Sequence, residues 1–202
     1  NPISNHEGMW IVFLSRGGTL QVLLQGDLSG GAEADPRLWA TAGNMWIAAN
    51  EPGKAALALD KALSGTGLQA EQRGEALLDR ARAAEAQNDL KTARSRVTEA
   101  ARTISGDPFL WYFSAALAIR EGDVVTAKAA IGKALALEPQ DPTVLFEAGH
   151  VYHFAGDLAA ASNYWSRALA IDPNGKSGQA TRQALALLDK PAAVQSEAPA
   201  TK

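Results

Sequence analysis

Three side chains in the C-terminal half of the chain have the types and the spacing of metal ligands. Glu147, His150 and His153 follow one another at intervals of three, which places them on one face of a helix. Glu-x-x-His occurs in carboxylate-bridged metal sites, but such sites draw ligands from several helices. The only other histidine in the sequence is His6. The pattern therefore favours polar residues that line a groove, and we expect no metal and no cofactor.

A second pattern, Gly175-Lys176-Ser177, resembles the end of a phosphate-binding loop. That loop needs a glycine five residues before its second glycine, and Ala170 stands there. No strand is expected ahead of it. The sequence also lacks the G-x-S-x-G, H-E-x-x-H and G-x-G-x-x-G patterns, so we predict that the protein is not an enzyme.

The amino-acid composition excludes several classes of function. The 202 residues are 47% hydrophobic but only 6% aromatic, and abundant alanine favours closely packed helices. A net charge of −3 argues against nucleic-acid binding, which needs a basic face. The absence of cysteine excludes disulfides and thiolate sites. No apolar run reaches the roughly 18–20 residues of a membrane helix. We expect a soluble cytoplasmic or periplasmic protein, processed or trimmed ahead of Asn1.

A repeated pattern positions these residues. Four units open at Pro36, Gly74, Pro108 and Pro142, at spacings of 38, 34 and 34 residues. Each predicts two antiparallel helices, with a Gly-Asp or Asn-Asp turn between them in the last three units. We place the units at 36–73, 74–107, 108–141 and 142–175. The four extra residues of the first unit fall in its closing loop.

Aligned units show columns of small and large residues, which is what helix pairs that stack on one another require. Small residues recur in the first helix and at two places in the second: Gly43, Ala81, Ala115 and Gly149; Ala55, Ala93, Ala127 and Ala161; Ala62, Ala100, Ala134 and Ala168. Large residues recur between them: Trp39, Leu77, Trp111 and Leu145; Leu59, Val97, Ile131 and Trp165.

The two ends of the chain do not follow the repeat pattern. Residues 1–35 hold two apolar runs around Ser15-Arg16-Gly17-Gly18 and are either a degenerate helical repeat or a β-hairpin followed by a loop. The interval of 34 between Pro2 and Pro36 slightly favours helices. Residues 176–189 predict a helix that caps the last repeat, and the Pro- and Ala-rich residues 190–202 predict a disordered tail.

The period of 34, the small columns and the closing Leu137-Glu138-Pro139 and Ile171-Asp172-Pro173 resemble tetratricopeptide repeats over about residues 36–175. The second unit departs from the pattern, with Ser105 at the place of the closing proline. The resemblance implies an all-α fold: a right-handed superhelical α-solenoid of helix pairs with a C-terminal capping helix. It also implies a concave groove, lined by the first helix of each unit, that binds peptides or protein segments.

Register then predicts the groove residues. They are Arg37, Ala40, Asn44 and Ile47; Glu75, Leu78, Arg82 and Glu85; Phe109, Tyr112, Ala116, Ile119 and Arg120; and Thr143, Phe146, His150, His153 and Phe154. As binding residues we select Asn44, Arg82, Phe109, Tyr112, Arg120, Phe146, His150, His153 and Phe154, because aromatic side chains make good peptide anchors. Some aromatics could instead pack between helices.

Some tetratricopeptide proteins grip a C-terminal carboxylate with lysine and asparagine side chains. Asn44 matches that arrangement, but Ala40 stands where the lysine should be and Arg82 where the second asparagine should be. We therefore predict no carboxylate clamp, and the arginines read more simply as solvated surface residues.

We predict a protein-interaction scaffold that binds a protein or peptide partner in its groove, with no nucleic-acid partner and no membrane insertion. The alternative is a structural protein that forms homo-oligomers through its apolar segment 9–24.

Overall fold

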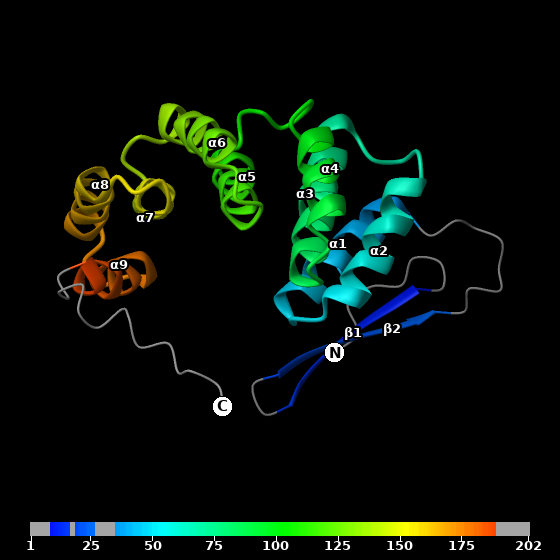
Figure 1. The fold of residues 1–202 in the computed structure, drawn as a ribbon. Helices are drawn as coiled ribbons and strands as arrows, with labels where there is room; N and C mark the ends of the chain where they lie inside the picture. Colours follow the sequence, from blue (N-terminus) through cyan, green and yellow to red (C-terminus); the bar gives the residue numbers. More distant parts are fainter. Residues whose placement is uncertain (1–8, 17–18, 27–34, 189–202) are drawn as a thin grey trace, which may run out of the picture. The chain divides into compact units, whose positions relative to one another are not determined.

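The computed structural model describes residues 9–16, 19–26 and 35–188, which form a β-hairpin and a succession of α-helices (Figure 1). The strands are β1 Met9–Arg16 and β2 Thr19–Gly26. The helices are α1 Pro36–Ala48, α2 Pro52–Ser64, α3 Ala70–Ala86, α4 Leu90–Ala100, α5 Pro108–Arg120, α6 Val124–Leu137, α7 Pro142–Phe154, α8 Leu158–Ile171 and α9 Lys176–Leu188. The helix pairs predicted from the repeats are confirmed.

Local residues determine where most helices begin. Asp107 and Asp141 cap α5 and α7, and a proline follows each at the first helical position. A carboxylate oxygen of Asp141 accepts hydrogen bonds from the backbone N–H of Thr143 at 2.9 Å and of Val144 at 2.8 Å. An aspartate cap satisfies N–H groups that lack a partner within the helix. Interactions between residues close in sequence therefore determine where these repeats begin.

The turn inside each pair uses a residue in the left-handed region. Gly122 and Gly156 have φ of +77° and +78°, and Asn50 and Asn88 take the same place with φ of 57° and 61°. Glycine adopts this conformation without steric cost, and asparagine tolerates it better than most residues. An aspartate then caps the second helix of the last three pairs, as Asp157 does by accepting from the Ala160 N–H at 3.0 Å.

The small columns lie where the two helices of a pair cross. Gly43 faces Leu59, and Gly149 faces the Trp165 ring. Ala81 and Ala115 are fully buried, as are the alanines of the other two columns. A small side chain in one helix leaves room for a large one in its partner, so the core alternates between the two sizes.

The chain divides into two compact units, residues 1–104 and 105–202. In the first, α1 pairs with α2, α3 pairs with α4, and α1 also packs on α3. In the second, α5 pairs with α6, α7 pairs with α8, and α5 packs on α7. Each unit thus contains two repeats with their first helices side by side.

Helix α9 closes the second unit by packing on α8 and α7. Ala184 is buried there with Trp165, and Leu185 and Leu188 pack against the same cluster. Arg182 on the same helix is exposed. A helix with one apolar and one polar face suits the end of a repeat array, which agrees with the predicted capping helix.

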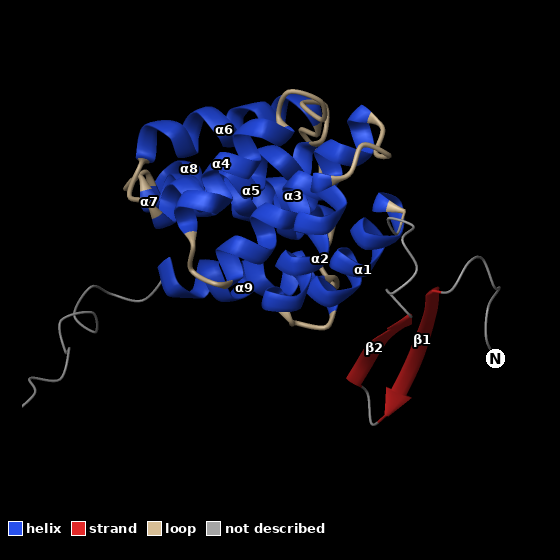
Figure 2. Cartoon of the chain, turned by 90° about the vertical axis from the view of Figure 1, so that its right-hand side faces the viewer, coloured by secondary structure: helices blue, strands red, loops and turns tan. Residues whose placement is uncertain are grey.

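The N-terminal segment differs from the expectation that was slightly favoured. Residues 9–26 do not form a helix pair, because β1 and β2 pair antiparallel from Met9 opposite Gly26 to Arg16 opposite Thr19 (Figure 2). Neither apolar run contains the glycine or alanine that a helix crossing needs, and a Gly-Gly dipeptide between two apolar runs favours a hairpin. The predicted loop at 27–34 and the tail at 190–202 lie outside the described residues.

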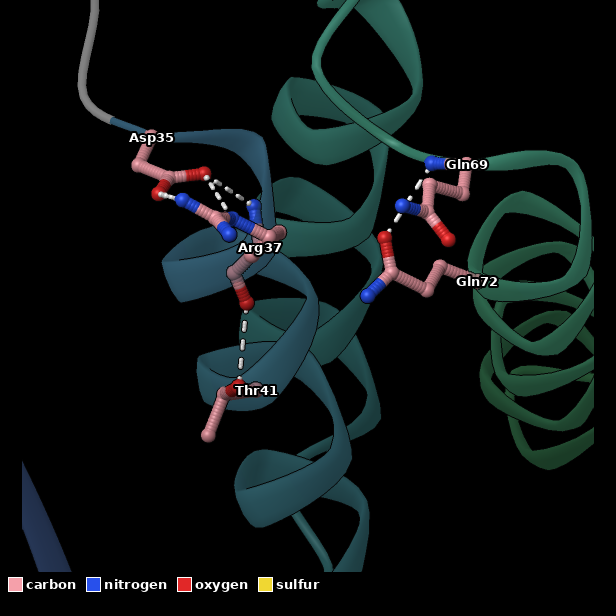
Figure 3. A network of polar contacts seen from close by, with 5 residues as sticks. All are labelled: Asp35, Arg37, Thr41, Gln69 and Gln72. Atoms are coloured by element: carbon pink, nitrogen blue, oxygen red, sulfur yellow. Dashed lines mark hydrogen bonds and ion pairs between the residues drawn. The ribbon is translucent and has the colours of Figure 1, made fainter.

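A second difference concerns α3, which begins at Ala70 rather than at the predicted Gly74. Residues 70–73, which the repeat units place at the end of the first unit, therefore extend this helix by one turn. The Gln69 N–H donates to the Gln72 side-chain oxygen at 3.1 Å at this start (Figure 3). Among the described residues, no helix has the length and apolar character needed to cross a membrane.

Candidate binding surfaces

An aromatic row lies on α5 in the second unit. The Phe109 ring centroid is 5.0 Å from that of Tyr112, edge to face, and 5.9 Å from that of Phe113. Asp107 orients the start of the row by accepting from the Phe109 N–H at 2.8 Å. Phe109 and Tyr112 were predicted groove residues, whereas Phe113 was missed although it follows Phe109 by one helical turn. All three rings are partly exposed.

Helix α7 carries a second cluster, which is organised by Trp165 of α8. His150 lies 4.5 Å from Phe146 and 5.4 Å from Trp165 between ring centroids, and His153 lies 5.6 Å from Trp165. The indole N–H of Trp165 donates to the Phe146 carbonyl oxygen at 3.0 Å. Trp165 is only 2% exposed. The structure thus brings together three predicted residues around a side chain that register had assigned to packing alone.

Tyr112 of α5 packs against a buried cluster that combines residues of α5, α6 and α7. The prediction left open whether such aromatics bind a partner or pack between helices, and Tyr112 packs on one side while part of its ring stays exposed. Phe154, at the end of α7, is 41% exposed, and Arg120 is exposed at the end of α5.

Two titratable groups of α7 have shifted pKa values. Burial raises the pKa of Glu147 above its usual value, because ionisation is less favourable away from water. Burial, and then the neighbouring His153, lower the pKa of His150. The lowered pKa favours the neutral imidazole of His150. No three His, Asp or Glu side chains between residues 35 and 188 gather as metal ligands; the two imidazoles of α7 contact Trp165 instead.

The polar groove residues of the first unit meet at Asp79. Its Oδ2 accepts from the Asn44 amide nitrogen at 2.8 Å, and its Oδ1 accepts from an Arg82 guanidinium nitrogen at 2.8 Å. Asp79 was missed, although an acid three residues before an arginine on a helix is a recognisable ion-pair spacing. Leu78, predicted to line the groove, is 3% exposed and belongs to the core, so that assignment was wrong.

A pocket of about 320 Å³ lies between α1 and α3 in this unit. Asn44 and Asp79 line it together with Arg37, Ala40 and Glu75. Of these, Arg37, Ala40, Asn44 and Glu75 were predicted from register. The pocket and the α5–α7 surface belong to different units, and a single groove that contains both stays a prediction.

Comparison with known proteins relates part of the chain to a family. Residues 118–187 match a family model described as tetratricopeptide repeat. Over these residues the chain resembles tetratricopeptide repeats. A search of curated protein sequences gave no match.

Solved structures show the same fold. MamA has a TM-score of 0.60 at 17% identity over 69% of this chain and 79% of that one. YrrB, described as a tetratricopeptide protein with an unusual peptide-binding site, has a TM-score of 0.62 at 17% identity over 77% and 78% of the two chains. The first tetratricopeptide domain of Spaghetti, described as bound to an HSP90 peptide, has a TM-score of 0.50 at 20% identity over 60% and 99%.

Proposed function

We propose that the second unit binds an extended segment of a partner protein on the aromatic surface of α5 and α7. This surface, called here the α5–α7 surface, consists of Phe109, Tyr112, Phe146, His150, His153 and Phe154. The observation that supports the proposal is that these rings are partly or well exposed while their positions are restrained by contacts beneath them. Rigid aromatic side chains anchor a partner at low entropic cost.

Trp165 is the main source of that restraint. Its indole is buried, bonded to the α7 backbone and in ring contact with His150 and His153. These ring contacts restrain both imidazoles on the surface of α7. Because the lowered pKa of His150 favours its neutral form, this surface presents aromatic rings with a few hydrogen-bonding atoms, which suits the apolar side chains of a peptide.

Structural neighbours agree with this use of the fold. YrrB is described as having an unusual peptide-binding site, and the Spaghetti domain as bound to an HSP90 peptide. Arg120 and its equivalents remain predicted contacts for polar groups of the partner. Self-association through residues 9–24 also stays a prediction, because the side chains of the hairpin lie outside what the structure describes.

The test is a peptide-array screen with the full chain, repeated with a Tyr112→Ala/Phe146→Ala double variant. We expect the double variant to lose the peptides that wild type selects. Since both rings are partly packed, a His150→Ala/Phe154→Ala variant, changed at exposed positions, gives a second reading without threatening the core. Val125→Ala is the matched control, because Val125 is 80% exposed on α6, outside this surface.

Circular dichroism establishes that each variant is folded before binding is compared. If both double variants stay folded and bind the selected peptides as wild type does, the α5–α7 surface is not the binding site. Loss of binding in the Val125→Ala control would also contradict the proposal, since it would place the contact on another face.

A further inference from the structure

The pocket between α1 and α3 combines an apolar lining with carboxylates. Ala40, Met45, Leu68 and Ala76 contribute apolar atoms, while Glu75 and Asp79 contribute acidic groups. Its volume of about 320 Å³ lies at the lower end of the range for small-ligand pockets. The space is therefore suited to one side chain of a partner and not to a whole folded element.

The cation of the pocket is already engaged. The Arg37 guanidinium turns back on Asp35, which caps the same helix, with Nη2 2.6 Å and Nε 2.9 Å from Oδ2 (Figure 3). This pairing also lowers the pKa of Asp35 below its usual value. Arg37 and Asp35 thus form a neutral pair at the rim, and Arg37 contributes little positive charge to the interior.

Asp79 is engaged as well. Its two oxygens accept from Asn44 and Arg82, and its side chain is only 17% exposed. The Asn44 amide therefore points its hydrogen at a carboxylate of the protein, which leaves it poorly placed to receive a carboxylate from a ligand. Among residues 35–188, Glu75 is the lining carboxylate without an ion pair, so the pocket and its paired rim together carry one excess negative charge.

We propose that this pocket receives a lysine or arginine side chain from a bound partner segment. The methylene stem would lie against Ala40, Met45 and Ala76, and the cationic head would face Glu75. Lysine and arginine combine an apolar stem with a charged end, and an exposed carboxylate beside an apolar cleft complements both parts. The proposal relies on the interaction function for the source of the side chain, but it uses contacts that belong to the first unit alone.

The experiment follows amide resonances of the ¹⁵N-labelled full chain during titration with three small probes. They are N-acetyl-arginine methylamide, its norleucine analogue, which keeps an apolar stem without charge, and its glutamate analogue. We expect the arginine probe to shift resonances of Asn44, Ala76 and Asp79 and to bind at least about threefold more tightly than the other two. Raising NaCl from 0.05 to 0.5 M should weaken this binding.

Variants assign the effect to the pocket. Glu75→Gln should weaken arginine binding about two- to fivefold, the range typical of an exposed ion pair. Glu71→Gln removes an exposed acid from the first turn of the same helix and should leave binding unchanged. Ala40→Leu fills the space and should abolish the shifts. It keeps the proposal testable if Glu75→Gln does not fold.

Equal affinity for the arginine and norleucine probes would overturn the proposal, as would preference for the glutamate probe or an unchanged affinity of Glu75→Gln. The Tyr112→Ala/Phe146→Ala variant separates the two proposals, because it should abolish peptide selection at the α5–α7 surface and leave arginine binding intact. Arginine binding that disappears in that variant would show that the probe occupies the other unit.

Discussion

Replacing Gly149 by alanine tests the packing rule that underlies the repeat. A Cβ at this position would lie 2.6 Å from Cε2 of the Trp165 ring and closer still to its Cδ1 and Nε1. Trp165 cannot easily retreat, because it is 2% exposed and its indole N–H is bonded to the Phe146 carbonyl oxygen at 3.0 Å. The new methyl group must therefore displace the ring or separate α7 from α8.

Two effects oppose each other in this variant. Alanine favours a helix interior over glycine by about 1 kcal/mol. Overpacking costs about 1–3 kcal/mol, and disturbing the Trp165 hydrogen bond adds about 1 kcal/mol. We expect Gly149→Ala to lower the free energy of unfolding by about 1–3 kcal/mol. The measurement is urea denaturation followed by circular dichroism, with the slope of the transition compared as well.

Gly132→Ala is the matched control. Gly132 lies inside α6, it is exposed, and a Cβ there would meet no atom within 4 Å. The same substitution should therefore stabilise the protein by up to about 1 kcal/mol. If Gly149→Ala raised stability as Gly132→Ala does, the reasoning about the small column would be refuted.

The neighbouring repeat suggests a second substitution that should compensate for Gly149→Ala. There the corresponding pair is Ala115 with Ile131, both fully buried. A Gly149→Ala/Trp165→Ile variant reproduces this pair in the last repeat. We expect it to lose less stability than the two single substitutions predict by addition, since contacting residues couple. Simple additivity would show that the two positions do not share one packing space.

Two further predictions concern the stability of variants at a helix cap and at a buried carboxyl group of α7. Asp157→Ala should lower stability by about 1 kcal/mol, because the Ala160 N–H loses its acceptor; an unchanged thermal midpoint would contradict the cap. Glu147→Gln should be more stable than wild type at pH 7. The pKa of Glu147 is raised in the folded state, so its contribution to stability is most favourable below its ordinary pKa and is lost as pH rises through the folded value. Thermal unfolding at pH 7 and pH 4 should show the advantage of glutamine shrinking at the lower pH, and a constant or growing advantage would contradict the burial of this carboxyl group.

Sequence patterns predicted most of the helical architecture because its determinants are short-range. Asp141 with Pro142 begins a helix, and Gly156 with Asp157 ends one and caps the next, whatever the rest of the chain does. The exceptions occur where local signals conflict. The repeat unit opens at Gly74 but α3 already starts at Ala70, and residues 9–16 and 19–26 pair as strands despite the interval of 34 between Pro2 and Pro36.

Candidate sites were less predictable, because register tells which face a residue occupies but not what it meets there. Register placed Phe146, His150 and His153 on one face of α7. It did not reveal that Trp165 of α8 reaches under them. It placed Leu78 in the groove, whereas packing buries it.

The sequence by itself determined the repeat, its caps and its alternation of small and large residues, since these depend on dihedral preferences and side-chain size within one helix pair. Only the tertiary structure decided that Asp79 joins Asn44 to Arg82 and that Glu75 lies unpaired beside an apolar pocket. The contact between Asp79 and Asn44 links α3 to α1 across 35 positions of the chain, and its geometry follows from how one repeat packs on the next.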